Sequence, residues 1–287
     1  MVGAASRDIS ADDPRGWRLG GAATYCSLAA ARLGLRVGCL IGVDEKASTA
    51  VEVAMLEAAG VTVRLARLGR GPVFENIERD DHRRQRWLSK SDLVSAASLP
   101  AEWRRSRGWL LGPVAGELGD EWASVPEASA IVGLGWQGML REFSDDGWVR
   151  RVAPAASGLA GAAGLVCASV DDLAPGTTLE NLRLVAPSAV VVLTAGADGG
   201  FSMAGRKKVT YAAVPAPAVV DPTGAGDVFL AALMAAWLLT GELATARALR
   251  FAAAAGSCAV EGVGLSGVPT RAAVAARLRD QGTSLRV

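Results

Sequence analysis

The hydrophobic and polar positions alternate between two kinds of segment along most of the chain. Continuous apolar runs of strand length, such as 36–43 and 189–194, are separated by Ala- and Leu-rich stretches of helical length, such as 22–33 and 47–59. A run that is apolar throughout and rich in β-branched residues is typical of a strand covered on both faces. Further strands are predicted at 61–65, 109–111, 130–134 and 165–167, and further helices at 226–240, 243–260 and 270–279. This alternation predicts an α/β fold with a mainly parallel sheet and helices on both sides.

One segment breaks the alternation. Residues 73–88 read VFENIERDDHRRQRWL, where aromatic and branched residues flank a polar turn at Asp80-Asp81. This pattern predicts a β-hairpin that leaves the main sheet. A polar excursion of this length is either a surface flap or a lid over a site. The single histidine, His82, lies in this turn and is interpreted as solvated, since a His-based metal site needs a second histidine.

The composition narrows the class of protein. The chain has 287 residues, of which 51% are hydrophobic and 21% charged, and we expect one domain over residues 1–287. The formal charge of +1 provides no overall field to recruit nucleic acid or a membrane surface. The basic runs at 83–86 and 206–208 are interpreted as solvated faces.

Location and redox chemistry follow from the cysteines and the apolar runs. The four cysteines form no C-x-x-C pair, and we expect them to be buried free thiols rather than zinc ligands. The longest apolar run, 228–239, is shorter than the roughly 20 residues that cross a bilayer. The N-terminus lacks a charged and then apolar leader, so the expected location is cytoplasmic.

The stretch VVDPTGAGDVFL near the three-quarter point carries the clearest candidate chemistry. Gly224, Ala225 and Gly226 precede an apolar helix, and small side chains leave backbone N–H groups accessible. The first N–H groups of a helix lack internal partners and carry partial positive charge, which suits a phosphoryl group. Asp227 follows, and we expect its carboxylate to remain ionised and to accept a proton from a hydroxyl. The alternative is a simple turn that caps a buried helix.

Two other nucleotide-binding motifs are disfavoured. No Gly-Lys dipeptide occurs, so a P-loop is excluded. Residues 133–138 form G-x-G-x-x-G, which would suggest an NAD-dependent oxidoreductase. That motif needs an acid about 20 residues later, and none occurs between Gly147 and Val170. We expect Gln137 and Gly138 to line an acceptor pocket instead.

Two segments resemble a known family. DPTGAGDVF at 221–229 is similar to the C-terminal signature of the ribokinase-like, or PfkB, carbohydrate kinases, and 20–45 is similar to their N-terminal di-glycine, helix and strand. The resemblance covers nearly the whole chain. It implies a three-layer α/β/α fold with a small β lid near 9–20 and 72–90. It also implies an ATP-dependent kinase that phosphorylates a hydroxyl of a small sugar or cyclitol, with Mg²⁺ as cofactor.

The resemblance also implies roles for individual residues. Asp227 would be the catalytic base, with an anion hole made by the N–H groups of Gly224, Ala225 and Gly226. The implied acceptor-binding residues are Asp8, Gly20, Gly21, Thr24, Phe74, Asn76 and Gln137. The implied nucleotide-binding residues are Thr194, Gly196, Gly199, Ala254 and Ser257. Asp221 and Thr223 match part of the site at which some members bind a monovalent cation such as K⁺.

Some residues depart from the family pattern. Thr24-Tyr25 replaces a common Ala-Asn, which implies a different acceptor pocket from that of ribokinase. The family's Asn-x-x-Glu is here Ser169-x-x-Asp172, where Asp172 would hold a water of the Mg²⁺ shell. This departure keeps open a kinase-shaped protein that binds a ligand without transferring phosphate, and a nucleoside kinase is a further alternative. Lid edges pair into dimers in this family, so a homodimer is an expectation by analogy.

Overall fold

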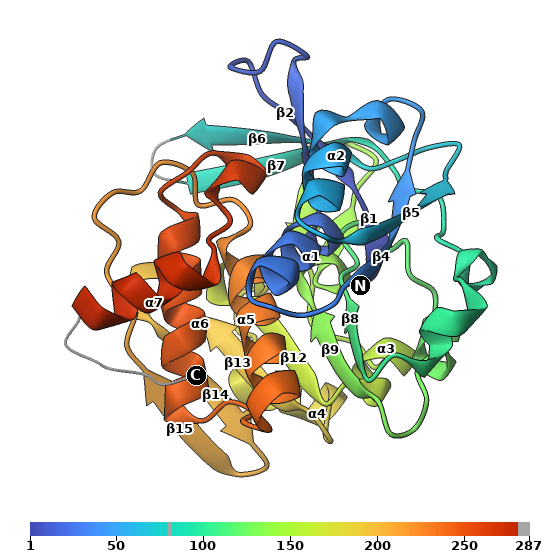
Figure 1. Cartoon of the computed structure of the whole chain (residues 1–287). Coiled ribbons are helices and arrows are strands. Elements are labelled where there is room, and N and C mark those ends of the chain that lie inside the picture. The colour runs from blue at the N-terminus through green and yellow to red at the C-terminus, as the bar shows by residue number, and fades with distance from the viewer. Residues whose placement is uncertain (80–81, 281–287) are drawn as a thin grey trace.

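The computed structural model describes residues 1–79 and 82–280. Within them, a nine-stranded sheet forms the centre of the molecule (Figure 1). From one edge to the other its strands are β15 (Lys207–Tyr211), β14 (Gly200–Ala204), β13 (Val190–Thr194), β12 (Leu165–Ser169), β9 (Ile131–Gly135), β8 (Gly108–Leu111), β1 (Val2–Ala4), β4 (Gly38–Val43) and β5 (Thr62–Arg67). Neighbours from β13 to β5 run parallel, and β14 and β15 are antiparallel.

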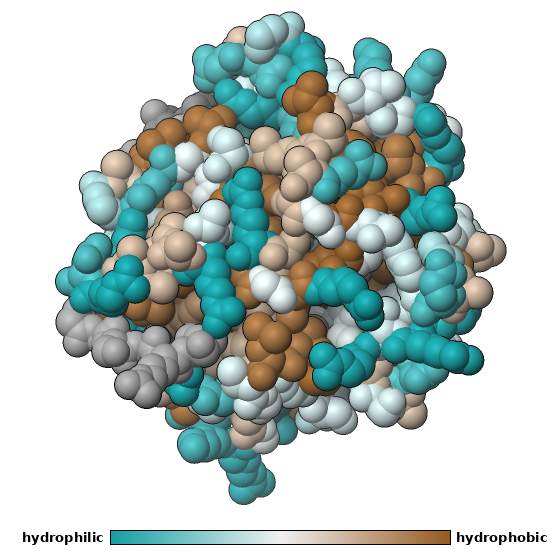
Figure 2. All heavy atoms as spheres, viewed as in Figure 1, coloured by the Kyte–Doolittle hydropathy of each residue, from teal (hydrophilic) through white to brown (hydrophobic). Residues whose placement is uncertain are grey.

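Helices cover both faces of this sheet. One face carries α1 (Ala22–Arg32), α2 (Val51–Ala58), α5 (Ala225–Thr240), α6 (Ala246–Ala259) and α7 (Arg271–Asp280), while α3 (Gly158–Ala162) and α4 (Leu179–Val185) pack on the other. Short 3-10 helices are η1 (Ala47–Thr49), η2 (Ala96–Ser98), η3 (Ala101–Arg105), η4 (Asp120–Ser124), η5 (Gln137–Met139), η6 (Val170–Asp172), η7 (Gly196–Asp198) and η8 (Gly264–Gly267). The expected three-layer α/β/α architecture is confirmed. In Figure 2 the face with α1, α5 and α6 mixes hydrophobic and hydrophilic side chains, and its rim is mainly hydrophilic.

Helix α5 is the centre of the larger apolar core. Its residues 228–236 are all buried, because α5 lies between α1, α6 and the sheet. A helix that is apolar on all sides is stable only in such a position, and each fully buried Leu contributes about 1.5–3 kcal/mol to stability. The glycines of the G-x-G-x-x-G string serve this packing, since a side chain at Gly133 would begin 2.6 Å from the Met234 sulfur. Trp136 in the same string is buried, and only the short η5 follows it.

A second, four-stranded sheet projects from one end of the molecule, at the top of Figure 1. Its order is β3 (Trp17–Gly20), β2 (Ser6–Ile9), β6 (Val73–Arg79) and β7 (His82–Ser89). We call this unit the lid sheet. The predicted hairpin at 73–88 therefore exists, while its Asp80-Asp81 turn and the side chain of His82 lie outside the described residues.

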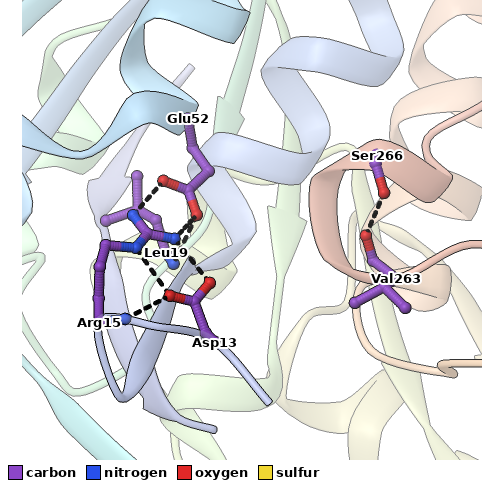
Figure 3. Close-up of polar contacts among 6 residues, drawn as sticks. All are labelled: Asp13, Arg15, Leu19, Glu52, Val263 and Ser266. Carbon is purple, nitrogen blue, oxygen red and sulfur yellow. Dashed lines mark hydrogen bonds and ion pairs between the residues drawn. The ribbon is translucent and has the colours of Figure 1, made fainter.

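A clamp ties the lid sheet to the main body. Arg15, in the turn between β2 and β3, donates hydrogen bonds to Glu52 of α2 at 2.7 and 2.8 Å and to Asp13 at 2.9 and 3.0 Å (Figure 3). Glu52 is 8% exposed and also accepts the Leu19 N–H at 3.3 Å. Although burial pushes the pKa of Glu52 upward, the bonds from Arg15 and from backbone N–H groups together outweigh it, and the pKa lies below its ordinary value. The clamp therefore joins two charged groups that are largely removed from water.

A small hairpin packs against the lid sheet. Strands β10 (Arg141–Phe143) and β11 (Val149–Arg151) pair antiparallel, and Trp148 bridges to Arg86 of β7. Phe143 lies 6.1 Å from Phe74 and 6.0 Å from Trp87, measured between ring centroids. We call 141–151 the support hairpin. It was not predicted, because its strands are short and carry no alternating apolar pattern.

The other predicted elements agree with the structure to within a few residues at their ends, although 47–59 divides into η1 and α2. Cys26, Cys39 and Cys167 are buried and free, and Cys258 is free and half-buried. Among the described residues no helix combines the length and apolarity needed to cross a bilayer.

Candidate active site

The candidate residues gather where the parallel strands end. Asp8 follows β1, Gln137 follows β9, Asp172 follows β12 and Thr194 ends β13. The carboxyl ends of neighbouring parallel strands lie at one edge of the sheet, which is where open α/β folds bind ligands. The N-terminus of α5 reaches this edge, since the charges of Asp8 and Asp172 both act on Asp227. The structure therefore brings the predicted acidic residues into one site.

The turn before α5 has a backbone conformation that favours glycine. Gly224 caps the helix in the left-handed region with φ 80°, and a side chain there would begin 2.2 Å from the Tyr25 ring. Gly226 is exposed, and an added Cβ would meet no atom within 4 Å. The Ala225 N–H is not open in this way, because it donates a long hydrogen bond of 3.3 Å to the Pro222 carbonyl. The open side of the turn is thus at Gly226.

Asp227 is the third residue of α5 and is half-buried. Burial, followed by the negative charges of Asp172 and Asp8, raises its pKa from 3.8 to about 7, while Arg141 opposes the rise. We expected an ionised carboxylate, and a pKa of about 7 leaves Asp227 only partly ionised at neutral pH. The sequence shows the helix N-terminus, which favours ionisation, but not the neighbouring carboxylates. A group that titrates near pH 7 is well matched to accepting a proton.

Asp8 and the two glycines form one structural unit. Asp8 lies in β2, and a side chain at Gly20 would begin 2.3 Å from the Asp8 Oδ2 atom. Gly21 has φ 99° and begins α1, and a Cβ there would lie 2.5 Å from the Ala4 carbonyl oxygen. Gly20 therefore makes room for the Asp8 carboxylate, and Gly21 lets the helix start against β1.

Asp172 is surrounded by hydrogen-bond donors. Its Oδ1 accepts from Gln137 Nε2 at 2.9 Å and from an Arg141 guanidinium nitrogen at 3.4 Å. Its Oδ2 accepts the Ser169 N–H at 3.1 Å, which completes a capping box on η6. Gln137, expected to bind the acceptor, thus holds Asp172 in this structure.

The hydrogen bonds to Asp172 limit how its carboxylate could hold a metal ion. Among residues 1–79 and 82–280 no group of three or more His, Cys, Asp or Glu could hold a metal ion. A hydrated Mg²⁺ ion that meets Asp172 through water fits these residues, because Mg²⁺ retains several waters and needs few protein ligands.

Four predicted ligand-binding side chains are buried or engaged. Thr24 is 0% exposed and its hydroxyl donates to the Gly21 carbonyl at 2.6 Å. Phe74 is 3% exposed and packs on the support hairpin. Ala254 is 0% exposed, and Ser257 donates to the Pro215 carbonyl at 3.0 Å while accepting a bond from Arg277. The side chains of Thr24 and Ala254 are fully buried in this structure, and their binding roles stay predictions.

The remaining predicted residues lie at the end of β13 and in strand β6 of the lid sheet. Thr194 and Gly196 are half-buried and exposed at the end of β13, whereas Gly199 is buried with φ 84° against the Tyr211 carbonyl. Asn76 lies in β6, where its Oδ1 accepts a bond from Gln85 Nε2 at 2.9 Å.

Asp221 closes the loop before α5. Its two oxygens accept the N–H groups of Thr223 and Gly264, both at 2.9 Å. This bonding fixes the turn at 221–224 against the turn before η8, which lies opposite the Arg15 clamp in Figure 3.

Sequence reasoning missed Arg141 as a member of the site and did not foresee that Tyr25 lies under Gly224. Arg141 opposes the pKa rise of Asp227, and Tyr25 is 3% exposed under Gly224. Burial, followed by the charges of Asp8, Asp221 and Asp227, raises the pKa of Tyr25 well above its ordinary value. The signal for Arg141 was its position four residues after Gln137, in the loop that follows a strand of the sheet.

Comparison with known proteins relates part of this chain to one family and nearly all of it to one fold. The pfkB family carbohydrate kinase profile matches residues 154–271. No curated protein matches the sequence.

Solved structures of the same fold cover nearly the whole chain. A pyrophosphate-dependent kinase of the ribokinase family, complexed with a pyrophosphate analogue and myo-inositol, has a TM-score of 0.76 at 17% identity, covering 96% of this chain and 98% of its own. Ribokinase from Arabidopsis thaliana, complexed with ribose and ATP, has a TM-score of 0.68 at 18% identity, covering 97% and 98%. An Escherichia coli protein described as a putative ribokinase II, with ATP and Mg²⁺, has a TM-score of 0.70 at 17% identity, covering 98% and 99%.

Proposed function

We propose that the chain, whose residues 154–271 match the pfkB family carbohydrate kinase profile, is a ribokinase-like carbohydrate kinase. We propose that it transfers a terminal phosphoryl group to a hydroxyl of a small sugar or cyclitol, with Asp227 as the base. The observation that carries this proposal is the joint position of Asp227 and the Gly224 turn at the sheet edge that also holds Asp8. The family match and the acceptors of the fold relatives, ribose and myo-inositol, support the acceptor class.

Each residue has a simple role in this reaction. Asp8 accepts hydrogen bonds from acceptor hydroxyls and orients the ring, because a carboxylate can receive two of them. Asp227, with a pKa of about 7, takes the proton of the reacting hydroxyl as its oxygen attacks the phosphorus. The N–H groups of Gly224 and Gly226 and the α5 N-terminus stabilise the charge on the transferring group, and the Ala225 N–H joins them when its long bond to the Pro222 carbonyl opens.

The rest of the machinery supports phosphoryl transfer. The lid sheet covers the acceptor and excludes water, which would otherwise compete as phosphate acceptor. Mg²⁺ neutralises charge on the donor phosphates, with Asp172 holding one of its waters. Asp221 and Thr223 retain a proposed role beside a monovalent cation.

ATP is the proposed donor, and pyrophosphate is a second candidate. The fold relatives include both ATP complexes and a pyrophosphate-dependent enzyme. Pyrophosphate is favoured by Ala254 and Ser257, because these residues were expected to line a base pocket and are instead buried or bonded to Arg277. ATP is favoured by Val219 and Val220, which are 69% and 57% exposed and offer apolar surface to a base.

A screen of acceptors with both donors tests the proposal. Sugars, cyclitols, other polyols and nucleosides are incubated with Mg-ATP or Mg-pyrophosphate, and phosphorylated product is measured for the wild type and for Asp227→Asn. We expect turnover with a sugar or cyclitol that falls by about 10³-fold or more in the variant. Equal turnover in both proteins would remove Asp227 from the mechanism. Tight binding of an acceptor without product from either donor would favour a ligand-binding protein instead.

A further inference from the structure

A pair of opposite charges lies beside the proposed reaction centre. Arg141 and Asp172 are 14% and 10% exposed at their side chains, and their closest atoms are 3.4 Å apart. Charge-assisted N–H···O bonds are normally about 2.7–2.9 Å long, so the contact is a loose one. The guanidinium therefore adjoins Asp172 without a tight hydrogen bond to it.

Negative charge predominates in this part of the molecule. The charges of Asp172 and Asp8 act on Asp227, and those of Asp8 and Asp221 act on Tyr25. A phosphoryl donor adds further negative charge between these carboxylates. A site that accepts it needs cations, and Arg141 is a cation whose charge reaches Asp227.

The support hairpin determines where Arg141 lies. Arg141 is the first residue of β10, and two residues later Phe143 packs against Phe74 and Trp87 of the lid sheet. The Trp87 Nε1 donates to the Ser144 carbonyl at 2.9 Å, which fastens the hairpin to β7. One short strand thus connects the lid sheet to a cation at the phosphoryl site.

We propose that Arg141 contacts the transferring phosphoryl group and stabilises its charge, and that the support hairpin holds it there against the lid sheet. This inference rests on the proposed function and deepens it, because it assigns a protein cation to a phosphoanhydride donor. During transfer the guanidinium turns from Asp172 to the phosphoryl oxygens, whose planar arrangement of acceptors suits its fork of donors. Asp172 then remains bonded to Gln137 and Ser169.

Four variants test this role: Arg141→Gln, Arg141→Lys, Asp172→Asn and the control Arg150→Gln. Arg150 lies in the same hairpin, and its ion pair with Asp146 is exposed. We expect Arg141→Gln to lower kcat about 100-fold or more, as the loss of one transition-state donor does, with little change in the acceptor KM. Arg141→Lys keeps the charge but loses the fork, so it remains informative should the Gln variant fail to fold, and we expect about a 10-fold loss. Arg150→Gln should behave as the wild type.

The pH profile tests whether the charges of Arg141 and Asp172 act on Asp227 during turnover. The titratable groups that interact with Asp227 are Asp8 of β2, Asp172 of η6, Arg141 of β10, Tyr25 and Cys26 of α1, and Cys167 of β12. Arg141→Gln removes a positive charge, so the acid limb of kcat/KM should move to higher pH. Asp172→Asn removes a negative charge and should move it to lower pH. Both variants also break the same ion pair, so a purely structural role of Arg141 predicts equal losses of kcat, whereas contact with the phosphoryl group predicts a larger loss in Arg141→Gln.

Binding of unreactive donor analogues gives a readout that needs no acceptor. Calorimetric titration uses AMP-PNP and methylenediphosphonate, each with Mg²⁺. Whichever analogue the wild type binds, we expect Arg141→Gln to lower its affinity about 10-fold, since a charged hydrogen-bond donor is lost. Unchanged analogue binding in Arg141→Gln, or turnover within about threefold of the wild type, would overturn the inference. Such a result together with an inactive Asp227→Asn would leave the proposed function standing, whereas full activity of Asp227→Asn would remove that function.

Discussion

Replacing Asp227 with Asn should stop turnover and at the same time stabilise the folded protein. The pKa of Asp227 is about 7 in the folded protein, against an ordinary value of 3.8. Between these two values the folded protein binds more protons than the unfolded chain. Stability that depends on this proton is therefore present below pH 4 and is lost as pH rises through 7. Because Asn has no ionisable carboxyl group, the Asp227→Asn protein does not lose this stability as pH rises.

The size of the effect follows from the pKa difference. A shift of about 3 pH units corresponds to about 4 kcal/mol, which we take as an upper bound because Asp227 is only half-buried. We therefore expect Asp227→Asn to raise the free energy of unfolding by about 1–3 kcal/mol more at about pH 8 than at about pH 5.

Urea unfolding of the wild type and Asp227→Asn at the two pH values measures this difference. Asp198→Asn is the matched control, because Asp198 is an exposed carboxylate in η7 at the same end of the sheet. A gain that is equal at both pH values, or a loss of stability at about pH 8, would show that Asp227 is not held at an energetic cost.

Two further predictions concern the turn before α5 and the lid clamp. Gly224→Ala adds a carbon 2.2 Å from the Tyr25 ring at φ 80°, so we expect about 1–3 kcal/mol of destabilisation and a large loss of kcat, measured by thermal unfolding and steady-state kinetics. The Cβ added in Gly226→Ala meets no atom within 4 Å, so this variant should not lose stability. A Gly226→Ala protein that is less stable than Gly224→Ala would contradict the geometry. Glu52→Gln weakens the clamp to Arg15, and we expect the acceptor KM to rise about 3- to 10-fold with a smaller change in kcat. Asp92→Asn, which weakens the exposed Arg70–Asp92 ion pair, is the control. An unchanged acceptor KM in Glu52→Gln would show that the clamp does not influence acceptor binding.

Much of the fold could be predicted because its signals are local. The run after Gly224 is apolar on every side, which only a buried helix allows, and α5 is such a helix. The apolar run at 189–194 predicted β13 for the same reason. The support hairpin could not be predicted, since Phe143 is stabilised by Phe74 and Trp87, which are distant in the sequence.

For the site, the sequence alone determined which backbone could bind an anion and which acid stands beside it. These properties depend on consecutive residues, namely Gly224 with its left-handed conformation and Asp227 in the first turn of α5. Only the tertiary structure decided the pKa of that acid, the burial of Thr24 and Ala254, and the approach of Arg141. Burial and charge interactions depend on distances through space, and the folding of β10, η6 and α5 to one edge of the sheet sets those distances.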